Sequence, residues 1–376
     1  MKKTLLATLC SALFAACGGQ KEATVSDSGL LCADFRTEMD GKAVDIYILK
    51  NKNGMEVCLS NFGARILSIW VADRSGVMRD VTLGFDNIQD YRNRSVMGAT
   101  VGRYAGRIGF GKATIDGVEY NFPANNRFHT IHGGPESFQA RVWDARRKGP
   151  REVAFSLVSP DGDNGFPGNL EVTVAYRLTD DNALEIKYRG KSDKTTILNL
   201  TNHVYFNLDG DPGVKIFDYV MQIDADRYTP IDSTQLTTGE LLPVEGTPMD
   251  FRSPTSVGLR IFDDYPPLKY GTGYDHSWAL NHAGEMGWLQ ATAESPESGI
   301  ILELYTDEPA VQFYAAGTLG TTTGRGGVSM GAYSAFCFEA QKFPDSVNKP
   351  HWPSTELKPG EEFKATCVYK FSVRKE

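Results

Sequence analysis

Residues 44–60 read VDIYILKNKNGMEVCLS, and they predict a β-hairpin. Two apolar-rich runs flank a short polar segment that contains Gly54, and this arrangement is typical of two strands joined by a tight turn. Similar runs recur along the chain, and many are rich in Val, Ile, Thr, Tyr and Phe, which suit a pleated, half-buried surface. They cover residues 65–71, 153–158, 170–178, 183–188, 196–200, 300–305, 312–315, 335–338 and 363–371.

Helical periodicity is scarce, and residues 87–91 are the one segment that predicts a helical turn. Gly and Pro interrupt most of the remaining sequence. After Gly29 no change of composition marks a linker, and no repeat of the solenoid or propeller kind occurs. The sequence therefore predicts an all-β fold, a single large antiparallel β-sandwich with few short helices, over residues 35–376.

The N-terminus has the features of a bacterial lipoprotein signal. A basic start, Met1-Lys2-Lys3, precedes an apolar run that is too short to span a bilayer as a stable helix, and Leu13-Phe14-Ala15-Ala16 then leads into Cys17. We predict a signal peptide over residues 1–16 and lipidation of Cys17. The alternative is a plain secretory signal that is cleaved near the same place.

A flexible tether is predicted over residues 17–34, because much of this stretch is small, polar and rich in Gly and Ser. The expected location is the periplasmic side of a bacterial membrane, and the sequence does not distinguish the inner from the outer membrane. We expect a monomer or weak dimer.

The net charge is −8, which gives no electrostatic attraction to nucleic acid or to an anionic membrane surface. We therefore expect no nucleic-acid partner, and membrane contact only through the lipid anchor. Outside the leader, the cysteines are too widely spaced for a zinc ribbon or a disulfide-dense scaffold. Buried free thiols are predicted at Cys32, Cys58, Cys337 and Cys367. Disulfide bonds between them are the alternative, because an exported protein could form them.

Two glycine-rich segments carry charged or titratable side chains. Residues 101–108 read VGRYAGRI and bring Arg103 and Arg107 to a backbone that a ligand can approach closely. Arginine forks suit bidentate contacts to pairs of oxygens, but a solvated surface loop is the alternative. Residues 129–134 read HTIHGG, which indicates a polar pocket wall or an ordinary turn, and a metal site would need a further ligand.

Three further segments interrupt the strand pattern with polar chemistry. Residues 201–208, TNHVYFNL, place His203 between carboxamides and aromatic rings, although a packed, half-buried histidine is the commoner case. Residues 271–278, GTGYDHSW, contain Asp275 on a loop, as an acceptor for hydroxyls or part of an Asx turn. Residues 336–341, FCFEAQ, place Glu339 in an apolar strand, where burial would raise its pKa.

At these five segments, in this order, the chain resembles the aldose 1-epimerase (galactose mutarotase) family, and the resemblance runs from about Val44 to the C-terminus. Four further stretches strengthen it: DRYTPID at 226–232, GTPMDF at 246–251, FPDSVNKP at 343–350 and LKPGE at 357–361. The family fold is a two-layer β-supersandwich, which agrees with the strand-rich pattern. Gly106 stands where many members carry Asn, which puts one hydroxyl contact in doubt.

The resemblance implies a role for each matching side chain. Glu339 would be the general base and His203 the general acid. The sugar would be bound by a second group of residues, namely Arg107, His132 and Asp275, with Asn202 and Gln341 as lesser contacts. No metal or other cofactor is implied.

The implied reaction interconverts the α and β anomers of free aldohexoses such as galactose and glucose. The ring opens when the C1 hydroxyl loses a proton and the ring oxygen gains one, so we expect a base and an acid on opposite sides of the hemiacetal. At their ordinary pKa values Glu339 would be ionised at neutral pH and His203 partly protonated, and we expect Asp275 to keep His203 protonated.

Other functions stay open at this point. An exported glycoside hydrolase would need two carboxylates, for which Asp275 and Glu339 can be nominated, but His203 would then lack a role. A sugar-binding protein without catalysis would not need Glu339 or His203. A metal-dependent hydrolase would use His132, His203 and Asp275. The preferred aldose is not evident from the sequence.

Overall fold

The computed structural model describes residues 24–92 and 96–374. In this part of the chain, strands and turns dominate, and two short α-helices occur, α1 (Ile88–Arg92) and α2 (Pro266–Gly271). The predicted helical turn corresponds to α1. No pattern in the sequence predicts α2, because this helix is very short and begins with two prolines. The predicted signal peptide and Cys17 lie outside the described residues.

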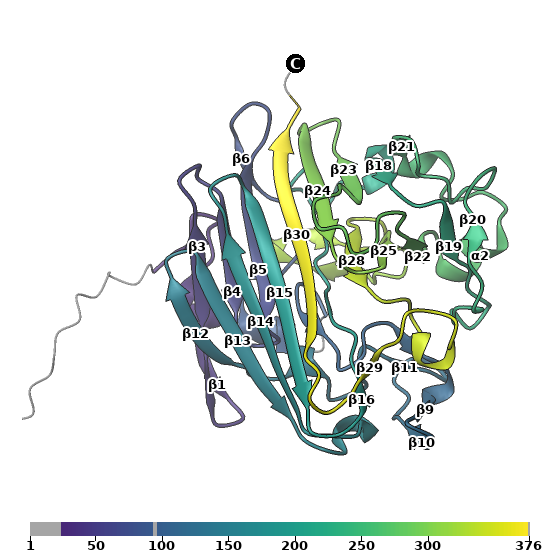
Figure 1. Cartoon of the computed structure of the whole chain (residues 1–376). Coiled ribbons are helices and arrows are strands. Elements are labelled where there is room, and N and C mark those ends of the chain that lie inside the picture. The colour runs from purple at the N-terminus through teal and green to yellow at the C-terminus, as the bar shows by residue number, and fades with distance from the viewer. Residues whose placement is uncertain (1–23, 93–95, 375–376) are drawn as a thin grey trace, which may run out of the picture.

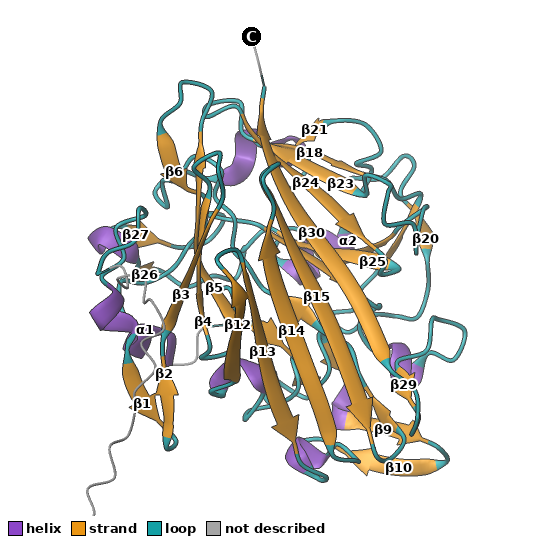
Figure 2. Ribbon diagram, turned by 60° about the vertical axis from the view of Figure 1, so that its left-hand side comes forward, coloured by secondary structure: helices purple, strands orange, loops and turns teal. Residues whose placement is uncertain are grey.

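The largest layer is an antiparallel sheet in which the C-terminal strand β30 lies between β15 and β24 (Figures 1 and 2). Side chains along β14 and β30 alternate between buried and more exposed positions, so one face of the sheet covers the core. In spatial order its nine strands are β12 (Asp144–Gly149), β13 (Glu152–Ser159), β14 (Leu170–Leu178), β15 (Ala183–Ser192), β30 (Phe363–Val373), β24 (Ile300–Thr306), β23 (Ala291–Glu294), β18 (Val220–Ile223) and β21 (Thr255–Ser256).

Two smaller antiparallel sheets form the second layer (Figure 1). One continuous hydrophobic core joins them to the large sheet. The four-stranded sheet contains the predicted hairpin and consists of β3 (Ile46–Lys50), β4 (Glu56–Ser60), β5 (Arg65–Ala72) and β6 (Met78–Asp80). The five-stranded sheet consists, in spatial order, of β20 (Leu242–Pro243), β19 (Arg227–Thr229), β22 (Asp275–Ala279), β25 (Ala310–Tyr314) and β28 (Cys337–Gln341).

Short two-stranded ribbons connect the layers and close their edges. The pairs are β1 (Thr37–Met39) with β2 (Lys42–Val44), β7 (Thr100–Val101) with β17 (Thr201–Asn202), β8 (Arg107–Ile108) with β11 (Thr130–Ile131), β9 (Lys112–Ile115) with β10 (Val118–Asn121), β16 (Thr196–Ile197) with β29 (Glu356–Leu357), and β26 (Thr322–Thr323) with β27 (Ser329–Met330).

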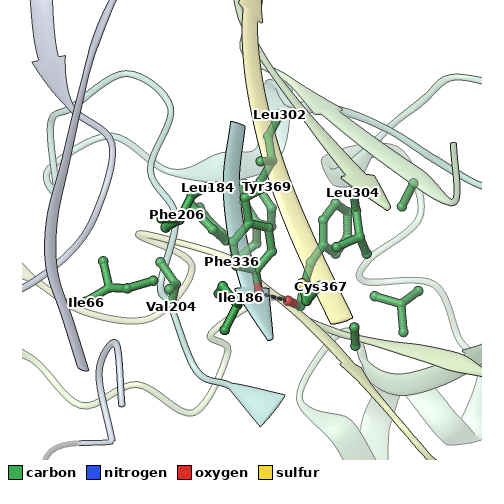
Figure 3. Packing of buried hydrophobic residues seen from close by; sticks show 14 of the residues in the cluster. Ile66, Leu184, Ile186, Val204, Phe206, Leu302, Leu304, Phe336, Cys367 and Tyr369 are labelled. Carbon is green, nitrogen blue, oxygen red and sulfur yellow. Dashed lines mark hydrogen bonds between the residues drawn. The ribbon is translucent and has the colours of Figure 1, made fainter. Parts of the chain in front are cut away.

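Aromatic rings fill the core between the layers (Figure 3). The Phe206 ring centroid lies 5.6 Å from that of Phe336 and 5.0 Å from that of Tyr369. The Tyr369 hydroxyl donates a 2.7 Å hydrogen bond to the Phe338 carbonyl. This bond ties β30 of the large sheet to β28, because a buried phenol needs a polar partner.

The predicted all-β sandwich is confirmed by these sheets, and most predicted strand positions match. Several strand boundaries differ by two or more residues, and two of these differences concern segments that lead to the candidate site. Residues 196–200 form only the two-residue strand β16, since residues 198–200 leave that ladder to lead into β17. The last predicted short strand lies two residues further along, at β28, so Glu339 and Gln341 both stand within a strand.

Residues 24–35, which overlap the predicted tether, lie packed against the sandwich. The backbone N–H groups of Asp27 and Ser28 each donate a 3.1 Å hydrogen bond to the buried carboxylate of Glu56. Leu30 and Phe35 are buried. Within the described residues, the packed domain therefore extends back to residue 24, because apolar residues of this short segment lie in the core.

The cysteine prediction agrees with the structure. Its four cysteines are buried and unpaired in the part of the chain that the structure describes. None of the helices in that part has the length and hydropathy of a membrane span.

Candidate active site

A cleft of about 550 Å³ opens on the five-stranded sheet, on the face opposite the hydrophobic core. Strands β25 and β28 are buried on both faces. In β28, Phe338 points into the core, whereas Glu339 and Gln341 line the cleft, as the two-residue period of a strand requires. The register places Gln312 beside Glu339 and Asp275 beside Tyr314, so neighbouring strands present polar groups on one face.

The opposite walls come from the glycine-rich segments. Arg107 in β8 pairs with Ile131 in β11, and His132 follows directly. Its backbone has a φ of 52°, a left-handed conformation that turns the chain toward the cleft. His203 follows β17, and its backbone N–H donates to the Ala99 carbonyl at 2.9 Å. The fifth predicted segment contains β28, and the other four converge with it on one cleft.

Glu339 and His203 lie side by side at the bottom of this cleft. The His203 Nε2 is 3.7 Å from the Glu339 Oε1, and the residues are only 5% and 3% exposed. We expected an acid and a base on opposite sides of the substrate; the structure instead places them next to each other. Two adjacent groups are sufficient for a hemiacetal, because both reacting oxygens are bonded to the same carbon.

Aromatic rings fix the orientation of the His203 imidazole. The Tyr205 ring is stacked on it at a centroid distance of 5.0 Å and an interplanar angle of 12°. The His132 and Tyr314 rings meet it nearly edge-on, at 5.2 and 6.3 Å. Its Nδ1 lies 3.5 Å from the Cys337 Sγ. The sequence pointed to aromatic rings beside His203, but Tyr314 and Cys337 come from distant strands and were missed.

Burial shifts both members of the pair toward their neutral forms. It lowers the pKa of His203 to about 4. Burial, reinforced by the Asp275 carboxylate, raises the pKa of Glu339 well above its ordinary value, while Arg107 acts in the opposite direction. The expectation that Asp275 keeps His203 protonated is therefore wrong. Burial therefore favours, in the free protein, the arrangement in which the proton shared by the pair resides on Glu339 and His203 is neutral.

A network of amides holds Asp275 and Arg107. The Arg107 Nη1 lies 4.0 Å from the Asp275 Oδ2, and its Nη2 donates to the Gln235 Oε1 at 2.8 Å. The Gln312 Nε2 donates to the Asp275 Oδ1 at 2.7 Å, and Ser277 donates to Gln312 in turn. Gln235 and Gln312 both line the cleft and were missed, because an isolated glutamine gives no signal in a sequence.

His132 presents a hydrogen-bond donor to the cleft. Its Nδ1 accepts the backbone N–H of Gly106 at 3.3 Å, and burial lowers its pKa well below the ordinary value. A neutral imidazole that accepts at Nδ1 carries its proton on Nε2. One donor atom from each of His132, His203 and Glu339 lies within 4.8 Å of the others, but this tautomer leaves His132 without a free lone pair for a metal ion.

Gly106 itself has a φ of 77°. A Cβ at this position would lie 3.0 Å from the Pro344 side chain. An Asn here tolerates the backbone conformation but requires Pro344 to move slightly, so the glycine suits the packing of this chain.

The two lesser predicted contacts separate in the structure. Gln341 lines the cleft, and its buried Oε1 has no hydrogen-bond partner. Asn202 is buried away from the cleft and donates to the Gly98 carbonyl at 2.9 Å and to the Tyr176 hydroxyl at 3.0 Å. Its predicted contact with a sugar is thus not supported, because its amide serves the packing beneath β17.

Only one of the two arginines and one of the two histidines in the glycine-rich segments belong to the cleft. Arg103 is 2% exposed, and its guanidinium donates to the carbonyls of Ser159, Pro167 and Gly168 at 2.8 to 3.1 Å. His129 is buried, and its Nδ1 accepts the N–H of Phe110 at 3.0 Å. Both side chains fix loops rather than reach a ligand.

Comparison with known proteins identifies the family. The aldose 1-epimerase family model matches residues 45–370. Galactose mutarotase from Bos taurus is 40% identical over 321 residues, 85% of this chain and 92% of that protein. Aldose 1-epimerase from Escherichia coli is 38% identical over 335 residues, 88% and 96% of the two chains. The chain belongs to the aldose 1-epimerase family.

Solved structures agree with this assignment. A GalM/aldose epimerase homologue from C. elegans has a TM-score of 0.82 at 30% identity and covers 89% of this chain and 100% of its own. Galactose 1-epimerase from Lactobacillus acidophilus has a TM-score of 0.79 at 32% identity, with 90% and 97% covered. The predicted family, its fold and its enzyme class, an isomerase, are confirmed, and nothing favours the hydrolase or the non-catalytic binding protein.

Substitution of Arg103 and of Arg107 in this member of the aldose 1-epimerase family tests their different roles. Arg103→Met leaves several buried carbonyls without donors and should reduce the free energy of unfolding by about 3–5 kcal/mol. Arg107→Met should cost about 1 kcal/mol of stability. In the sugar-binding role that the resemblance implies for Arg107, it should also lower kcat/KM at least about tenfold, through loss of a charged contact. Urea unfolding and polarimetry measure the two effects. Equal losses of stability would contradict this division of roles.

Proposed function

We propose that Glu339 and His203 are the proton-transfer pair of this epimerase and that its substrates are free aldohexoses such as galactose and glucose. The observation that carries this proposal is the buried 3.7 Å approach of the His203 Nε2 to the Glu339 Oε1 at the bottom of a polar cleft. An uncharged sugar needs only an acid and a base in contact with its hemiacetal.

The reaction requires the pair in its charged form, with Glu339 as carboxylate and His203 as imidazolium. Glu339 takes the proton of the C1 hydroxyl and the His203 Nε2 gives a proton to the ring oxygen, while the bond between C1 and that oxygen breaks and the aldehyde forms. Rotation about the C1–C2 bond exposes the other face. Glu339 then returns its proton to the aldehyde oxygen as His203 takes back the other, and the ring closes.

The neutral form of the pair is the one left after ring opening. Burial favours this neutral form over the ion pair in the free protein. The site therefore stabilises the protonation state of the pair that accompanies the open-chain sugar. The reactive form differs only by transfer of one proton within the pair. No proton has to enter or leave the cleft during a turnover.

Four side chains would hold the sugar against the pair. Arg107 offers a guanidinium fork, and His132 offers its Nε2–H. Asp275 and the unpartnered Gln341 Oε1 offer acceptors. Donors and acceptors of both kinds match a ring of hydroxyl groups, each of which can donate and accept.

Conservative variants of the pair test the proposal. Glu339→Gln and His203→Asn should each lower kcat for the decay of optical rotation of fresh α-galactose or α-glucose by at least about a hundredfold, the contribution of one positioned proton transfer. Glu56→Gln changes a buried glutamate outside the cleft, and His282→Asn changes a half-buried histidine outside the cleft whose Nδ1 contacts the Asp224 carboxylate. Both are matched controls that should keep the wild-type rate. Full activity of both pair variants would refute the assigned roles, and release of sugar from a glycoside would indicate a hydrolase.

The pH dependence follows from the sign of each shift. Below about pH 4, the pKa of His203, both groups are protonated and no base is left. Above the raised pKa of Glu339 neither group can act as the acid. A plot of kcat/KM, corrected for the uncatalysed rate, should therefore have its acid limb near pH 4. Asp275→Asn should move the alkaline limb to lower pH, because Asp275 raises the pKa of Glu339. An acid limb near pH 6.5 would contradict this account.

We also propose that the protein is exported and anchored by a lipid on Cys17, and that it acts as a monomer or weak dimer on the periplasmic side of the membrane. The basic start, the short apolar run and the position of Cys17 support the anchor. In a bacterial host fed an alkyne-tagged fatty acid, the full chain should take up label. Cys17→Ser should abolish labelling and Cys10→Ser should not. Undiminished labelling of Cys17→Ser would exclude this anchor.

A further inference from the structure

The Cys337 thiol is the polar neighbour of the catalytic imidazole that the reaction leaves unused. Cys337 is fully buried in β28, two residues before Glu339 and on the same face of the strand. Its Sγ lies 3.5 Å from the His203 Nδ1. Among the residues that the structure describes, this is the one side-chain contact at Nδ1, and the backbone of His203 itself also offers an acceptor to the ring.

The proposed reaction restricts which nitrogen of His203 carries a proton. Nε2, the nitrogen that faces Glu339, must give a proton in ring opening and take one back in ring closure. It can take one back only if it has a free lone pair in the neutral form. A neutral imidazole has one N–H, so that proton must stay on Nδ1 throughout the cycle.

We propose that Cys337 is a positioning residue whose sulfur accepts the Nδ1–H of His203 and thereby turns the Nε2 lone pair toward Glu339 and the sugar. This inference rests on the proposed roles of Glu339 and His203. The 3.5 Å separation suits a hydrogen bond to sulfur, which is a longer and weaker acceptor than oxygen.

A neutral acceptor is what this site requires. Burial, reinforced by Glu339 and Asp275, raises the pKa of Cys337 well above its ordinary value, so the thiol stays uncharged. A carboxylate at the same place would stabilise the imidazolium and hold the proton on His203. The neutral sulfur fixes the tautomer of His203 without making the release of the Nε2 proton less favourable.

The other side chains around His203 do not compete for Nδ1. Tyr205 covers the face of the ring, and His132 and Tyr314 meet it edge-on. Glu339 lies at Nε2. Arg107 and Asp275 line the same cleft.

Nitrogen-15 NMR of histidine-labelled protein without substrate tests the tautomer directly. The His203 signals, assigned with His203→Asn, should show a protonated Nδ1 and an unprotonated Nε2 at neutral pH. Cys337→Ala should shift the population toward the Nε2–H tautomer, whereas Cys337→Ser, whose hydroxyl can also accept, should retain the wild-type form. A protonated Nε2 in the wild-type protein, or an unchanged spectrum of Cys337→Ala, would overturn the proposal.

Kinetics give the second readout. Cys337→Ala should lower kcat by about three- to tenfold, the value of one modest hydrogen bond, with KM within about twofold. Cys337→Ser should recover most of the rate. Cys367→Ala removes another buried thiol, on β30 outside the cleft, and should keep the wild-type kcat. Equal losses of kcat in Cys337→Ala and Cys337→Ser would assign the cysteine to packing alone.

The two proposals fail in different ways. If wild-type protein does not accelerate mutarotation, the proposed function fails whatever the NMR shows. If it does, and Glu339→Gln is inactive while His203 carries its proton on Nε2, only the role of Cys337 fails.

Discussion

The proposed chemistry of this protein depends on one physical constraint: two adjacent titratable groups share a proton at a place where burial opposes charge on either of them. Glu339 and His203 are almost fully buried, and burial opposes charge on each. In such surroundings the pair has two accessible arrangements, the neutral one and the ion pair, which differ by the position of a single proton. Mutarotation has the same requirement, since it moves one proton onto the sugar as it removes another.

The sandwich creates those surroundings. A strand in a two-layer sandwich normally has one face in the core and one in water, but β25 and β28 are buried on both faces. Glycine-rich loops that carry Arg107 and His132 cover the outer face and leave a cleft between. The core side is apolar, with Phe313 and Phe338, and it fixes the strands on which the polar residues stand.

Much of this arrangement could be predicted from sequence. Strand alternation predicted the fold, and the motif order placed Glu339, His203, Arg107, His132 and Asp275 in one family site; all five line the cleft. The predictions that failed are those that depend on distances between side chains and on burial. Side-chain partners such as Gln312 and Cys337 stand on strands whose register no local pattern reveals. The direction in which the pKa of His203 shifts depends on how deeply the ring is buried in the folded protein. The sequence motif suggests Asn202 as a ligand contact, and only the structure shows that its amide donates to the Tyr176 hydroxyl instead.

Arg103 shows how the site is kept ready for its ligand. Its guanidinium fastens the loops around Ser159 and Pro167 to the backbone that leads to Arg107. With this clamp in place, Arg107 and His132 occupy their positions before any sugar arrives. Less conformational entropy is then lost on binding, and a small, weakly held sugar does not have to organise its own site.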